Sequence, residues 1–91
     1  MTDKKSYVVT YDLCEPGQNY DDLIEAIKTY NWCKIAESAW VITSTKSSVD
    51  IRDHLEAKID KNDKLFVGQL AGNAAWYGES NDVSQWLKDN I

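Results

Sequence analysis

The stretch Ser6–Leu13, SYVVTYDL, decides the fold class of this 91-residue chain. It is rich in β-branched and aromatic residues, which is typical of a β-strand. Alternation along a strand puts Tyr7, Val9 and Tyr11 on one face and Val8 on the other. Because both faces carry apolar side chains, we expect a sheet that is covered on both sides.

The residues after this strand predict a turn and then a helix. Glu15-Pro16-Gly17 ends the strand, because proline lacks the backbone donor and glycine accepts turn geometry. Asn19 is a good N-cap for a helix over residues 20–30, and Asn31 suits its C-terminal cap. The helix has an apolar stripe at helical spacing, formed by Leu23, Ile24, Ile27 and Tyr30.

The middle of the chain continues the alternation of strands and helices. Residues 33–45 predict two short strands, or one long strand broken by a bulge near Glu37-Ser38. A second helix is expected from the serine pair 47–48 to about residue 60. Residues 64–70 (KLFVGQL) predict the last clear strand.

This order predicts an α+β fold, the ferredoxin-like β-α-β-β-α-β sandwich with a four-stranded antiparallel sheet. We expect a single domain over residues 1–91, with its core at about 6–70 and a C-terminal appendage at 71–91. Within the appendage, Ala74–Tyr77 predicts a short edge strand. Asp82 or Asn81 is expected to cap a closing helix.

The second face of the sheet is the strongest argument for self-association. Right-handed crossovers place both helices on one face, and one helical layer cannot bury both sides. Trp40 and Phe66 need cover whichever way their strands alternate. The cover must come from the C-terminal segment, a second copy of the chain, or both, so we predict a homodimer.

The charge and hydropathy of the chain argue against two classes of partner, nucleic acids and membranes. The net charge is −5, which disfavours nucleic-acid binding, and Lys4 and Lys5 are the only adjacent cations. No apolar run is long enough for a membrane span or a signal peptide, so we expect no membrane partner and a cytoplasmic location. Cys14 and Cys33 are then expected to be free thiols.

Several segments resemble one known family. They are Tyr11-Asp12-Leu13, Lys34–Val41 (KIAESAWV), Ile59–Val67 (IDKNDKLFV) and the aromatic stretch Asn73–Tyr77. Together they resemble the small CRISPR-associated adaptation protein, the second of the two universal ones. The similarity to the family spans about residues 6–70. The nearest branches are its SinR-like and virulence-associated protein D-like relatives, and it is the SinR-like branch that also shares the aromatic stretch at Asn73–Tyr77.

The resemblance implies a homodimer built across open sheet faces. It also implies that Asp12 points into the dimer cleft and binds Mg²⁺ with its symmetry mate, as in the nuclease members. Ser38 matches a strand serine beside that cleft, so Asp12 and Ser38 are the candidate catalytic residues, with Asp12 as the metal ligand. The chain departs from the family where Arg and Lys are usual, because its first helix carries Asp21 and Asp22.

Three functions follow as hypotheses. The first is a dimeric binding or assembly module without catalysis. The second is a magnesium-dependent endonuclease, acting on RNA or DNA, that uses Asp12 from both protomers. The third is an acidic protein that binds a basic protein partner.

Other reactive or aromatic residues have simpler interpretations. Asp12 also suits a strand-end turn, Ser38 a bulge and Tyr11 the core. His54 lies one residue before the apolar Leu55 on the predicted helix and is expected to be solvated; without a partner cysteine, an aspartate triad or a second histidine, it is not expected to be catalytic. Trp76-Tyr77 is expected to serve packing or an interface instead of stacking on bases.

Overall fold

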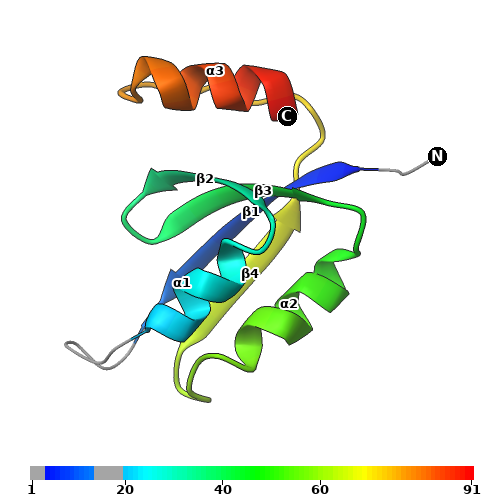
Figure 1. The fold of residues 1–91 in the computed structure, drawn as a ribbon, viewed down its shortest axis with the longest axis vertical. Helices are drawn as coiled ribbons and strands as arrows, with labels where there is room; N and C mark the ends of the chain where they lie inside the picture. The colour runs from blue at the N-terminus through cyan, green and yellow to red at the C-terminus, as the bar shows by residue number, and fades with distance from the viewer. Residues whose placement is uncertain (1–3, 14–19) are drawn as a thin grey trace.

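The computed structural model describes residues 4–13 and 20–91 of the chain (Figure 1). Strands and helices alternate in the mixed α+β manner that the sequence predicted. Their bounds are β1 Lys5–Asp12, α1 Asp21–Ile27, β2 Asn31–Ala36, β3 Ala39–Ser44, α2 Ser48–Glu56, β4 Lys64–Gln69 and α3 Asn81–Asn90.

The four strands form one antiparallel sheet in the order β2-β3-β1-β4. β1 lies in the interior, where Val9 faces Trp40 on β3 and Val67 on β4. The β2–β3 hairpin turns at 37–38, so the two-strand interpretation of residues 33–45 is confirmed. A register shift between Lys34 and Ala36 adds a small irregularity to this hairpin.

One face of the sheet packs against α1 and α2 (Figure 1). The buried core comes from odd positions of β1, even positions of β3 and the apolar stripes of both helices, as the alternation requires. Its members are Tyr7, Val9, Leu23, Ala26, Ile27, Trp40, Ile42, Ile51 and Leu55. This face is therefore closed by the chain itself.

The helix bounds differ from the sequence prediction at their ends. α1 ends at Ile27, and Asn31 opens β2 instead of capping the helix, so that prediction was wrong. The predicted cap Asn19 lies outside the described residues. α2 ends at Glu56, four residues earlier than expected. Within residues 4–13 and 20–91, none of the helices is long and apolar enough to cross a membrane.

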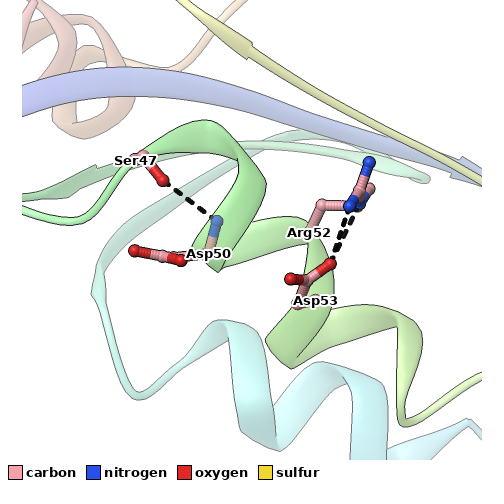
Figure 2. A network of polar contacts seen from close by, with 4 residues as sticks. All are labelled: Ser47, Asp50, Arg52 and Asp53. Atoms are coloured by element: carbon pink, nitrogen blue, oxygen red, sulfur yellow. Dashed lines mark hydrogen bonds and ion pairs between the residues drawn. The ribbon is translucent and has the colours of Figure 1, made fainter.

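The N-terminus of α2 shows why it begins where it does (Figure 2). The Ser47 hydroxyl accepts a hydrogen bond from the backbone N–H of Asp50 at 3.1 Å, which satisfies one of the unpaired donors of the first turn. Farther along, the chain's single arginine, Arg52, pairs with Asp53 at 2.8 Å. Both side chains are about half exposed, so this pair contributes little to stability.

The C-terminal region forms a helix but no strand. Residues 74–77 have no regular structure, so the predicted edge strand was wrong. α3 begins one residue after Ser80, whose hydroxyl accepts from the Val83 N–H at 3.2 Å, so the predicted cap at Asn81 or Asp82 was wrong. The Trp76 indole donates to the Ser84 hydroxyl at 3.1 Å, which ties the irregular segment to the helix.

α3 lies on the side of the sheet opposite α1 and α2 (Figure 1). It packs against β2, and the amide of Asn31 on β2 donates to the Asn90 side chain at 3.0 Å. Leu87 is the buried residue of this helix, with 3% of its surface exposed. The C-terminal segment thus covers part of the second face, as one of the sequence alternatives proposed.

Candidate functional site: the half-open face of the sheet

The second face of the sheet divides into two halves. Over β2 and β3, residues of the C-terminal segment meet Ile35 and Val41. Over β1 and β4, a group of side chains lies beyond this cover. We call this group the open patch, and its members are Thr10, Asp12, Lys64 and Phe66.

Phe66 is the main apolar feature of the open patch, with 61% of its surface exposed. It lies on β4 directly across from Thr10 on β1. Its ring passes close to Gly68 on the same face, since a Cβ at position 68 would approach the Phe66 Cε1 atom to 2.7 Å. The glycine therefore leaves room for the ring to lie along the strand.

Asp12 ends β1 at the edge of the open patch. Its side chain is exposed, and Lys64 lies directly across from it on β4. A shallow hollow of about 200 Å³ runs beside the pair, lined also by Thr10 and Phe66. Asp12 is thus accessible to a ligand or partner, with a cation as its neighbour.

Ser38 lies in the β2–β3 turn and is exposed. The Tyr11 N–H donates to the Ser38 carbonyl at 3.2 Å, so the turn extends the pairing of β3 with β1. This contact brings the backbone of one predicted site residue next to the neighbour of the other, Asp12. Both residues lie at one end of the sheet, and their catalytic roles stay predictions.

The described residues do not build a metal site within one protomer. They contain no group of three or more His, Cys, Asp or Glu side chains placed to hold an ion. Asp12 offers one carboxylate, and its cross-strand neighbour Lys64 is a cation. In the dimeric site that the family resemblance implies, a second copy would supply its own Asp12 as the second carboxylate.

Lys64 is the cation of the open patch, and two other lysines are held elsewhere. The ammonium of Lys28 lies 5.0 Å from the ring centre of Trp32, and that of Lys34 lies 5.4 Å from Trp40. Such cation–π contacts hold these two lysines over β2 and β3. This arrangement gives little support to a nucleic-acid surface around Asp12.

His54 has a partner that the sequence did not reveal. It is half-buried, and its Nδ1 atom is 2.7 Å from the Tyr30 hydroxyl, with the two rings edge to face. The expectation of a solvated histidine was wrong. The partner, Tyr30, follows α1 and lies 24 residues away in the sequence, so no local pattern revealed the contact. Burial, and then the charge of Asp50, raises the pKa of Tyr30.

Tyr11 and Trp76 have structural roles. The Trp40 indole donates to the Tyr11 hydroxyl at 3.2 Å, which fits the interpretation of Tyr11 as a core residue. Trp76 packs beside α3, whereas Tyr77 is fully exposed. The packing interpretation of this aromatic pair therefore holds for Trp76 alone.

The covered half encloses a buried thiol that sequence reasoning did not connect to the C-terminal segment. Cys33 is a free, buried cysteine on β2, and burial, followed by the charge of Glu79, raises the pKa of its thiol. Val41, which lies directly across from Cys33 on β3, lines a cavity of about 130 Å³ together with apolar side chains such as Trp76 and Leu87. No sequence motif marks this contact, since Cys33 and Glu79 are far apart in the chain.

Comparison with known proteins adds no family assignment. No protein-family model matches the chain. No solved structure matches it significantly either. The functional argument therefore depends on the chain's own residues.

Proposed function

We propose that this chain is a small homodimeric binding or assembly module that joins a second copy through its open patch. The observation that carries the proposal is the 61% exposure of Phe66 on a sheet face that α3 covers over its other half. Burying a phenylalanine side chain contributes about 1.5–3 kcal/mol. Two copies of Phe66 buried together would therefore favour association.

The proposal includes the ferredoxin-like fold and the relationship to the CRISPR adaptation protein and its relatives. The element order and the strand order β2-β3-β1-β4 support the former. The sequence resemblance at Tyr11–Leu13 and Lys34–Val41 supports the latter. A cytoplasmic location is also part of the proposal, and the free thiol of Cys33 agrees with it.

Sedimentation velocity over a range of protein concentrations tests the dimer. The wild-type chain should shift from monomer toward dimer as concentration rises. Phe66→Glu should remain monomeric, because two carboxylates would face the interface. Tyr77→Glu is the matched control, since it changes another exposed aromatic in the same way and should dimerise like the wild type. A wild-type chain that stays monomeric at all concentrations would overturn the proposal.

A second candidate is a magnesium-dependent endonuclease that uses Asp12 from both protomers. The exposure of Asp12 at the end of β1, with the Ser38 turn beside Tyr11, favours it. The test is cleavage of RNA and of duplex DNA with and without Mg²⁺. Cleavage that requires Mg²⁺ and disappears in Asp12→Asn would support the nuclease, and no cleavage by the wild type would exclude it for those substrates.

A third candidate, binding to a basic protein, has its own observation. Asp21, Asp22 and Glu25 are all exposed on α1, away from the open patch. A basic partner captured on this helix should be released by salt at about 0.5–1 M, where screening acts over a few ångströms. Capture that is indifferent to salt would contradict a charge-driven contact.

A further inference from the structure

β4 is an edge strand whose outer backbone groups have no partner within the described part of the chain. The sheet order places β1 on one side of β4 and nothing on the other. The Leu70 N–H donates to the Ser6 carbonyl at 2.8 Å, so the backbone groups of residue 70 point toward β1. In an antiparallel pair the bonded positions alternate, so Phe66 and Gly68 bond to β1.

The remaining positions point outward. Leu65, Val67 and Gln69 direct their N–H and C=O groups to the open edge, and no hydrogen bond from these groups is found among the described residues. Such an edge is a template for pairing with another strand. Its side chains on the helical face, Leu65 and Val67, are only half-buried. The edge therefore lacks both hydrogen-bond partners and full apolar cover.

We propose that a second copy of this chain pairs with that edge, β4 against β4 and antiparallel, with Phe66 directly opposite the partner's Phe66. This inference rests on the proposed homodimer and names its contact. The two sheets would join into one continuous sheet of eight strands. Phe66 would occupy a pair without mutual hydrogen bonds, where opposing side chains come closest.

Only this register matches apolar residues with apolar residues on both faces. It places Leu65 against the partner's Val67, so the two helical cores become continuous, and the Phe66 rings meet on the other face. A shift of one residue to centre on Val67 would place Leu65 against the partner's Gln69. A shift the other way would place Phe66 against the partner's Lys64. Register is set by such apolar matching.

Charge does not oppose the pairing despite the net charge of −5. The hollow along this edge measures about 550 Å³ and is lined by charges of both signs, among them Arg52 and Glu56 of α2. Within β4 the one charged side chain is Lys64, which would face the partner's Gly68. No like charges are placed directly opposite each other in the paired strands.

The geometry separates this dimer from one built around a shared metal. With about 4.8 Å between strands and about 3.4 Å per residue, the two Asp12 residues would lie roughly 20 Å apart. That distance is too long for a shared ion. A six-residue edge is also a small interface, so we expect a weak dimer, with Kd on the order of 10 μM.

Single cysteines report the register directly. In a Cys14→Ser background, Phe66→Cys should form an intermolecular disulfide under mild copper-catalysed air oxidation, because opposing Cα atoms in such a pair are about 4.5 Å apart. Lys64→Cys is the matched control on the same face of the same strand. It should not crosslink, since its two copies would be separated by four residue positions, or about 14 Å. Asp12→Cys should not crosslink either.

The three variants separate failure of this inference from failure of the homodimer. Crosslinking at position 66 alone supports the β4–β4 pair. Crosslinking at position 12 instead would overturn it while leaving a dimer packed face to face. A Phe66→Cys chain that dimerises by sedimentation under reducing conditions yet forms no crosslink on oxidation would also overturn the edge pairing, and a wild-type monomer would overturn both.

Discussion

The two halves of the second sheet face differ in how well the chain covers their apolar side chains. Over β2 and β3, α3 and the segment before it bury apolar side chains, with Leu87 at 3% exposure. Over β1 and β4, Phe66 is 61% exposed, and among residues 4–13 and 20–91 no strand lies along the outer edge of β4. The first half is covered by the chain itself, and we propose that another copy meets the second half along the β4 edge, at Phe66.

This difference shows what an appendage of about twenty residues can achieve. A ten-residue helix is about 15 Å long and about 10 Å across, so it can cover only part of a four-stranded face. It packs against β2, and Phe66 on β4 is left 61% exposed. The size of α3 therefore sets how much of the face remains for a partner.

The largest expected effect is on the covered half. Leu87→Ala removes the buried side chain that joins α3 to the sheet, and we expect the free energy of unfolding to fall by about 2–4 kcal/mol. Urea unfolding at low protein concentration measures it. Val49→Ala, an exposed apolar position on α2, is the matched control and should cost less than about 1 kcal/mol. Equal losses in both variants would mean that α3 does not cover this half.

A smaller effect should come from the helix cap. Ser80→Ala removes the hydroxyl that accepts from the Val83 N–H and should destabilise the protein by about 1 kcal/mol. Ser47→Ala removes the equivalent cap of α2, at Asp50, and should cost a similar amount. Only Ser80→Ala should also speed modification of the Cys33 thiol, measured in a Cys14→Ser background. Equal rates in the two variants would contradict cover of Cys33 by the C-terminal segment.

Alkaline pH should weaken the covered half through Cys33. Its folded pKa is raised by burial and by Glu79, so the unfolded chain ionises first, near the ordinary value of 9.0. Stability from this group is present below that pH and is lost as pH rises toward the folded pKa. The decline in unfolding free energy above pH 9 should be smaller in Cys33→Ala. Identical pH profiles would show that the thiol is not held apart from water.

The smallest effect is expected on the open half. Phe66→Thr should change the stability of the monomer by no more than about 0.5 kcal/mol, because the side chain is mostly exposed and threonine suits a strand. Unfolding must be measured at a concentration where the wild type is monomeric. A loss of 2 kcal/mol or more would mean that Phe66 is buried by its own chain, and the contrast between the halves would disappear.

The sequence predicted the elements of the fold better than their ends. Alternation in Ser6–Leu13 and helical spacing around Leu23 and Ile51 are local signals, so strands and helices were found where these patterns occur. The end of α1 was predicted wrongly, because Asn31 pairs with Thr43 on β3 and therefore belongs to the sheet. The strand predicted at 74–77 is also absent because of a tertiary contact: the Trp76 indole bonds to Ser84 on α3, and the segment does not pair with a strand edge.

The candidate site depended even more on tertiary structure. The sequence identified Asp12 and Ser38, and the fold places both at one end of the sheet. It also identified Phe66 as needing cover, but only the β1–β4 register shows that its side chain lies opposite the helical layer. The Tyr30–His54 and Cys33–Glu79 neighbours join distant segments and carry no local pattern.

Residue-resolved hydrogen exchange of the wild-type protein, followed by NMR at several concentrations, tests the central claim most directly. The amides of Leu65 and Val67 should become more protected as concentration rises, whereas those of Phe66 and Gly68, already bonded to β1, should change far less. Amides of α3 around Leu87 should show no such dependence. Protection at Leu65 and Val67 that is the same at every concentration would contradict the account.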